Sequence, residues 1–191
     1  TIDKVMLGYY TSNENLAYYS LGQKIMEIIR TLLLAVIFVS IPRLSYYLEA
    51  DYARYISGLK NLATLVLFIT IPSSFGLFLI SKEVVLVFAG EQYIDAILPT
   101  QIFALRIIIL SLESIIAQQI LFIHSKEKII LLFNVIFGLM HIFVNYMFIN
   151  NLTPALTIFV TSFAEVLLII CELIYVNNKL DIKLNLFNKS I

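Results

Sequence analysis

Long uncharged stretches separated by short charged segments run through most of this sequence. The clearest is 61–81, which holds no Asp, Glu, Lys or Arg over 21 residues between Lys60 and Lys82. An α-helix rises about 1.5 Å per residue, so a stretch of this length crosses the roughly 30 Å of hydrocarbon in a bilayer. The pattern therefore predicts a transmembrane helix at 61–81. Pro72 and Gly76, near its middle, predict a kink or a broken turn there.

Four more stretches have the length and apolarity of transmembrane helices once isolated charged residues are accepted. In the first of them Pro42 is expected to end the helix, because proline lacks an amide hydrogen and disfavours helix in the residue before it. Residues 1–10 predict the end of a further, truncated helix, so the chain is expected to be part of a longer protein. The predicted class is an all-α integral membrane protein with about five full transmembrane helices plus the truncated one. The four stretches are 18–45, 96–125, 129–151 and 154–178.

Three charged segments separate or follow these stretches. Residues 49–60 are charged and aromatic at intervals, which is typical of an amphipathic segment in the headgroup region or of the start of the next helix. Residues 82–95 predict a loop with one helical turn, and 179–191 predict a polar tail. Lys and Arg are concentrated in 43–60, 125–128 and the tail, so the positive-inside rule places these segments in the cytoplasm.

The composition agrees with a membrane protein. Hydrophobic residues make up 60% of the chain and charged residues 14%, and the mean hydropathy is +0.92, whereas soluble domains are about 25% charged. Thirteen basic and thirteen acidic residues cancel, so no overall charge favours nucleic acid as a partner. The single cysteine, Cys171, excludes an intramolecular disulfide and a cysteine metal cluster. We expect no metal and no cofactor.

Ionisable residues inside the predicted helices are the main candidates for function, because burying a charge in lipid costs several kcal/mol. The helix 129–151 also carries Asn134, Gly138, His141 and Asn145 on one face. We expect the polar faces of the last three helices to turn toward one another around water. The charged candidates are Lys24, Glu27 and Arg30 in the first helix, Arg106 and Glu113 in the third, and Glu165 and Glu172 in the fifth.

Structural roles are an alternative for each of these residues. Glu165 and Glu172 would then neutralise Arg106 and Lys24, and His141 would be a hydrogen-bonded packing residue. The residues Asn134 and Asn145 would join helices, while the charges of the first helix would reach the interface. Tyrosines near the helix ends are typical of an interfacial belt; they are Tyr9, Tyr10, Tyr18, Tyr19, Tyr46 and Tyr47. No nucleophile elbow or phosphate-binding loop occurs, so we expect no enzyme.

Four short motifs carry a family resemblance that covers about the first half of the chain. An Asp-x-x-Met-Leu-Gly stretch is followed by Tyr-Ser-x-x-x-Lys-Ile, by Pro-Arg-Leu, and by a Pro-x-x-x-Gly helix that leads to Phe-x-Gly. In this order the chain resembles the second half of bacterial polysaccharide flippases, members of the multidrug/oligosaccharidyl-lipid/polysaccharide exporter superfamily. The matching residues are Asp3, Met6, Leu7, Gly8, Tyr19, Ser20, Lys24, Ile25, Pro42, Arg43, Leu44, Pro72, Gly76, Phe88 and Gly90.

The resemblance implies a MATE-like transporter of twelve helices in two lobes, of which residues 1–178 would be the C-terminal lobe and 179–191 a cytoplasmic tail. It implies flipping of undecaprenyl-diphosphate-linked oligosaccharide across the bacterial cytoplasmic membrane by alternating access, with polymerase and chain-length proteins as further partners. The substrate pathway would then include Lys24, Arg30 and Arg106. Glu113, His141, Glu165 and Glu172 would bind a coupling H⁺ or Na⁺ or balance the charge of the cations. Pro72 and Gly76 would form a hinge.

Two kinds of alternative stay open at this point. A cation-coupled drug exporter or a peptidoglycan lipid flippase of the same superfamily would share the fold and differ in substrate. A non-transporting membrane subunit of polysaccharide assembly, or a membrane enzyme such as a polysaccharide polymerase, would be a different class of protein. The polymerase would require a large catalytic loop outside the membrane, and the longest candidate here is 82–95.

Overall fold

The computed structural model describes residues 2–180, and within that range it contains helices and no strand. Five segments are long and apolar enough to cross a membrane, which confirms the predicted class. The helices are α1 (Ile2–Tyr10), α2 (Asn13–Ala50), α3 (Tyr52–Leu79), α4 (Ser81–Ala89), α5 (Ile97–Ser114), α6 (Glu127–Met147) and α7 (Pro154–Lys179). Shorter turns are the 3₁₀ segments η1 (Glu91–Ala96) and η3 (Ile149–Asn151), and the π-helix η2 (Ile115–Phe122) continues α5.

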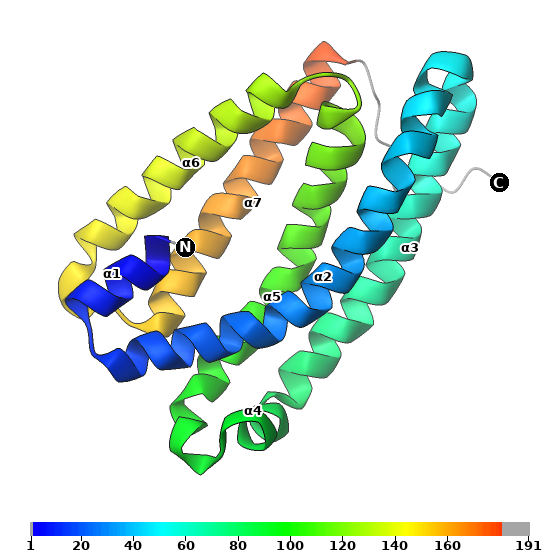
Figure 1. The fold of residues 1–191 in the computed structure, drawn as a ribbon. Coiled ribbons are helices and arrows are strands. Elements are labelled where there is room, and N and C mark those ends of the chain that lie inside the picture. The colour runs from blue at the N-terminus through cyan, green and yellow to red at the C-terminus, as the bar shows by residue number, and fades with distance from the viewer. Residues whose placement is uncertain (1, 181–191) are drawn as a thin grey trace.

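The central element of the bundle is α5. It packs against α2 and α3 on one side and against α7 on the other, while α6 packs on the outer side of α7 (Figure 1). The short helix α1 lies beside the lower part of α6, and α4 lies at the lower end of the bundle in this view. Because α6 and the lipid-facing sides of the other helices expose many large apolar side chains, the outer surface suits hydrocarbon.

The helix α2 continues through Pro42 and ends eight residues later, so the prediction that Pro42 terminates it is wrong. Proline is tolerated in membrane helices where side chains satisfy the backbone groups around it. Just before Pro42, the carbonyl of Ile37 accepts hydrogen bonds from Ser40 Oγ at 2.6 Å and from Gln119 Nε2 at 2.7 Å. The carbonyl that loses its helical partner to Pro42 is that of Phe38, so these donors add hydrogen bonds in the neighbouring turn.

The structure decides three further expectations about helix boundaries. Residues 49–60 form the junction of α2 and α3 at Asp51, whose carboxylate accepts from the amide of Arg54 at 3.2 Å, so the segment is the start of the next helix. The region 82–95, expected to be a loop with one turn, is mostly helix, because α4 occupies eight of its positions and is followed by Gly90, where φ is +81°. Of the kink or broken turn expected at Pro72, the broken turn is absent, since α3 is continuous there.

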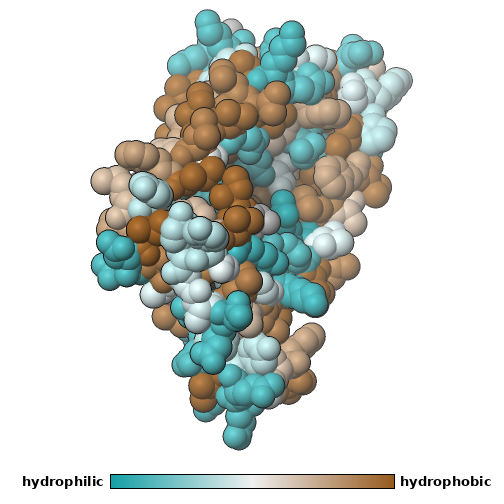
Figure 2. Space-filling view, turned by 60° about the vertical axis from the view of Figure 1, so that its left-hand side comes forward, coloured by the Kyte–Doolittle hydropathy of each residue, from teal (hydrophilic) through white to brown (hydrophobic). Residues whose placement is uncertain are grey.

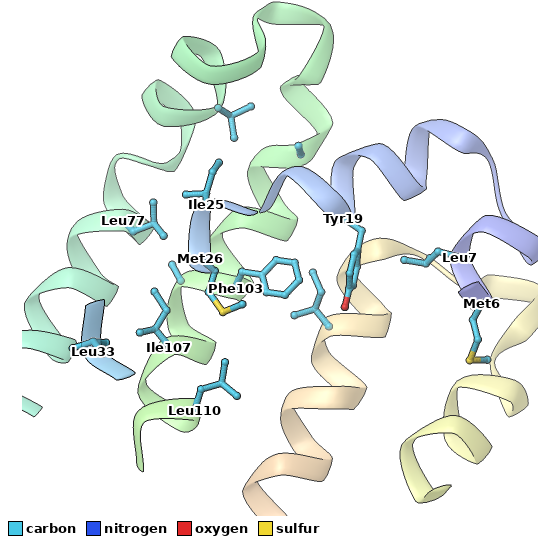
Figure 3. Packing of buried hydrophobic residues seen from close by; sticks show 14 of the residues in the cluster. Met6, Leu7, Tyr19, Ile25, Met26, Leu33, Leu77, Phe103, Ile107 and Leu110 are labelled. Atoms are coloured by element: carbon cyan, nitrogen blue, oxygen red, sulfur yellow. The ribbon is translucent and has the colours of Figure 1, made fainter. Parts of the chain in front are cut away.

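The buried side chains form two apolar clusters, one toward each end of the bundle. The lower cluster includes Met6, Leu7, Tyr19 and Phe103 (Figure 3). Tyr19 is 0% exposed, so its assignment to an interfacial belt is wrong. The upper cluster joins α2, α3, η2 and α7. Of the predicted tail, Lys179 is the last residue of α7, and 181–191 lie outside the described residues.

Candidate functional site

A buried carboxylate on α1 joins four helices at the lower end of the bundle. Asp3 is 3% exposed. Its Oδ2 accepts from the hydroxyl of Tyr19 on α2 at 2.8 Å and lies 3.1 Å from Thr161 Oγ1 on α7. Its Oδ1 lies 2.9 Å from Nε2 of His141 on α6. We call these four residues the Asp3 cluster.

Aromatic packing fixes the position of Tyr19. Figure 3 shows its ring reaching from α2 with the hydroxyl directed toward α7. The ring contacts that of Phe103 on α5 edge to face, with 5.1 Å between the ring centroids. The apolar lower cluster therefore positions the hydroxyl that donates to Asp3 and removes water from one side of the carboxylate.

An ion pair joins the two middle helices next to this cluster. Arg106 on α5 donates from Nε to Glu165 Oε2 at 2.9 Å and from its terminal Nη2 to Oε1 at 2.5 Å. The two side chains are 12% and 19% exposed. The guanidinium carbon also lies 5.7 Å from the centroid of the Phe103 ring. Two parallel charge-assisted bonds fix both the distance and the orientation of the helices.

The ion pair lies deep in the predicted membrane region. Glu165 is the twelfth of the 26 residues of α7, which places it about 16 Å from the start of the helix at 1.5 Å per residue. Thr161 is one turn closer to that start. Charged and polar groups at this depth are expensive in lipid, so they mark functional positions or strong structural contacts.

The Asp3 cluster and the ion pair border a pocket of about 170 Å³. Residues of α6 and α7 line it, among them Asn134, Gly138, His141, Thr161 and Glu165. In Figure 2 the side that carries α1 and α6 comes forward, and hydrophilic residues continue through the middle of this face between hydrophobic ones. The polar stripe of α6 thus faces polar groups of α7, and together they reach the surface.

Three of the predicted site residues, Arg106, His141 and Glu165, meet at this place. For Glu113 the charged neighbours include Glu165, Arg30 and Glu172. Glu172 is 0% exposed, and neither of its carboxylate oxygens has a hydrogen-bond partner. The alternative in which Glu165 neutralises Arg106 agrees with these contacts, whereas pairing of Glu172 with Lys24 does not.

The structure places Lys24 elsewhere. It is exposed and lines an open hollow of about 580 Å³ together with Lys4, Ser20 and Tyr93, at the side where α1, α2 and α4 meet. Arg30, two turns further along α2, is half-buried and its Nε has no partner. Lys24, Arg30 and Arg106, which were predicted to line one substrate pathway, therefore lie in three separate places in this structure.

The proposed hinge residues lie in the lower half of α3. Pro72 is exposed and Gly76 is half-buried. A Cβ atom added to Gly76 would meet nothing within 4 Å, so close packing does not require glycine there. Their role as a hinge stays a prediction.

Sequence reasoning missed Asp3 and Tyr19 as site residues, although both lie in the motifs that carry the family resemblance. The signal is the Asp3 carboxylate in the short α1 stretch, where it is followed by Lys4 and then by mainly apolar residues. That stretch was treated as the end of a truncated helix, so its carboxylate was not assigned to the polar interior. Among residues 2–180 no group of three or more His, Cys, Asp or Glu side chains is arranged to hold a metal ion.

Comparison with known proteins gives one family. A model of the family described as "Polysaccharide biosynthesis protein" matches residues 1–98. No curated protein and no solved structure matches the chain. The matched range includes Asp3, Tyr19 and Lys24, while Arg106, His141 and Glu165 lie beyond it.

Proposed function

The chain belongs to the polysaccharide biosynthesis protein family, and from this membership we propose that it moves lipid-linked oligosaccharide repeat units across the bacterial cytoplasmic membrane. The coarser role, in polysaccharide synthesis or export by a multi-pass membrane protein, follows from the family and the five apolar helices. Flipping is the specific step that the interior of the bundle supports best.

The physical problem is the polar headgroup. A glycan joined to a diphosphate cannot cross about 30 Å of hydrocarbon without a polar path. The observation that carries the proposal is the set of polar and ionised side chains buried at membrane depth, centred on Asp3 and the Arg106–Glu165 pair, which opens to the surface between α6 and α7. A protein that only anchored other components would not need this interior, because each such group is costly in lipid.

The hollow beside Lys24 is the best candidate for the diphosphate in this chain. It brings two ammonium groups, from Lys4 and Lys24, together with the polar side chains of Ser20 and Tyr93. Its volume of about 580 Å³ lies within the roughly 300–1,000 Å³ of small-molecule sites. Arg106 is less suited to this role, because Glu165 already accepts two of its hydrogen bonds.

The Asp3 cluster is the best candidate for coupling to H⁺ or Na⁺. Its carboxylate links α1 to α2, α6 and α7, so a cation that replaced the contact with His141 or Tyr19 would change how these helices are held together. Such a difference in ion affinity between two arrangements of the helices is what alternating access requires. Pro72 and Gly76 are proposed as the bending point.

The proposal makes the chain a transporter lobe and not an enzyme. Arg106 pairs with Glu165, and His141 contacts Asp3, across helix interfaces. By the positive-inside rule, the C-terminal end of α7 is proposed to face the cytoplasm.

Flipping by the complete protein tests the proposal. Vesicles that contain the purified protein and a fluorescent undecaprenyl-diphosphate oligosaccharide report the transfer of lipid between leaflets. We expect Lys24→Ala to slow transfer at least tenfold, and Lys82→Ala, an exposed lysine on α4 outside the hollow, to leave it unchanged. Normal transfer by Lys24→Ala at equal protein content contradicts the site. Absence of transfer by wild-type protein, with efflux of cationic drugs instead, contradicts the substrate.

A further inference from the structure

Glu172 is an isolated carboxyl group inside the upper half of the bundle. It lies on α7, two turns beyond Glu165, and its side chain is 0% exposed. Neither Oε1 nor Oε2 has a hydrogen-bond partner. A carboxylate buried without a partner costs many kcal/mol, and such groups become neutral instead of remaining ionised.

The charges around Glu172 do not compensate it. The charged group that faces it is Glu113 on α5, another carboxyl. Glu113 itself faces Arg30 on α2 and Glu165 on α7, and Glu165 is held by both hydrogen bonds of Arg106. Two arginines thus meet three glutamates in this part of the bundle, which leaves one glutamate without a cation. Glu172 is the glutamate without a cation, because its side chain is 0% exposed and its oxygens have no hydrogen-bond partner.

We propose that Glu172 carries a proton in this conformation and that, with Glu113 beside it, it forms a second proton-binding site of the lobe, separate from the Asp3 cluster. Release is the breaking of the carboxyl O–H bond, with the proton passing to water that reaches the site when the helices move apart. The purpose of this site rests on the proposed transport function, since a proton-coupled transporter binds and releases protons as its conformation alternates. Protonation itself rests only on the surroundings of Glu172.

A proton fits this site better than a metal ion. Hard cations collect several oxygen ligands, about six in most sites. No donor or acceptor lies within hydrogen-bond distance of the Glu172 oxygens, and the described residues contain no cluster of three or more acidic, histidine or cysteine ligands. A single proton needs only the carboxyl group.

The backbone next to Glu113 is irregular, which supports a functional site independently. The π-helix η2 begins two residues after Glu113 and extends over eight residues. Wide turns of this kind occur frequently at functional sites. The segment is tied to its neighbours where the hydroxyl of Tyr55 donates to the carbonyl of Gln119 at 2.9 Å and where Gln119 Nε2 donates to the carbonyl of Ile37 at 2.7 Å. The Gln119 Oε1 atom, like the Glu172 oxygens, is buried without a partner.

Infrared difference spectroscopy on the complete protein in lipid vesicles tests the assignment. At neutral pH we expect a carbonyl-stretch band of a protonated carboxylic acid that shifts in D₂O and is lost in Glu172→Gln. The matched control is Glu83→Gln, which removes an exposed carboxyl from α4 and should keep the band. Because glutamine has nearly the shape of a protonated glutamate, the variant should fold, and Glu172→Asp provides a second variant in which the band moves in frequency.

Persistence of the full band in Glu172→Gln overturns the proposal. Loss of the band from the wild-type protein when Na⁺ is added at constant pH also overturns the proposal, because it would indicate a sodium site. The spectrum does not depend on transport, so a protein that shows the band but fails to flip lipid-linked oligosaccharide would refute the proposed function alone.

Discussion

The two polar regions of the bundle differ in how completely their charges are matched. In the lower region Arg106 and Glu165 are joined by two hydrogen bonds, and Asp3 lies at hydrogen-bond distance from His141. In the upper region Glu172 has no hydrogen bond. Buried polar groups with hydrogen-bond partners hold the helices in one arrangement. A buried polar group without a partner is costly there and favours an arrangement in which it gains one. The lower region therefore joins four helices, and the upper region is where we propose that protonation changes.

Removing one partner of the ion pair should have the largest effect on stability. Arg106→Gln leaves Glu165 as a buried carboxylate without its cation, and we expect a loss of about 3–5 kcal/mol. The double variant Arg106→Leu with Glu165→Leu should recover most of this, because apolar residues can replace a buried pair at little cost. Unfolding in mild detergent provides the comparison. A single variant as stable as wild type would show that the pair is not buried in the folded protein.

Overfilling the contact between α2 and α5 should have the next largest effect. A Cβ atom on Gly22 would come within 2.9 Å of the Phe103 ring and 3.2 Å of the Thr100 backbone nitrogen. We expect Gly22→Ala to destabilise the protein by about 1–3 kcal/mol, since overpacking forces neighbours to shift. Gly76→Ala is the matched control, because the added Cβ meets nothing there and alanine favours a helix by roughly 1 kcal/mol over glycine. Equal thermal stability of the two variants would contradict the close packing.

Deleting one hydroxyl from the Asp3 cluster gives a smaller change. Tyr19→Phe keeps the contact with the Phe103 ring but removes a donor to the buried carboxylate, so we expect a loss of about 1–2 kcal/mol. Chemical denaturation of the purified protein measures it. A rise in stability would contradict a favourable hydrogen bond between this hydroxyl and Asp3.

The smallest effect is expected at the unmatched carboxyl. If Glu172 is already neutral, Glu172→Gln should change the stability at neutral pH by no more than about 0.5 kcal/mol, although the site is fully buried. Glu165→Gln, at the matched position two turns earlier, should cost several kcal/mol. A similar loss in both variants would remove the difference between the two regions.

Apolar stretch length predicted the five spanning helices well, because lipid leaves few alternatives to a helix. It failed at Pro42, which the helix passes through. The neighbouring turn there receives a hydrogen bond from Gln119, and a contact so far along the chain is not visible in local sequence. The residues of the ion pair were identified by their position in apolar stretches. Their partners were left open, because spacing within one helix does not fix which helices meet. Asp3 was missed for the same reason, since its partners lie 16, 138 and 158 positions away.

The most direct measurement is the flipping rate of lipid-linked oligosaccharide by the complete protein with Asp3→Asn, compared with wild type at equal content in vesicles. The variant keeps the size of the side chain and removes the charge that holds four helices together. We predict a rate at least tenfold lower, with Glu83→Gln unaffected. A rate equal to that of wild type would contradict the claim that these buried ionisable groups drive transport.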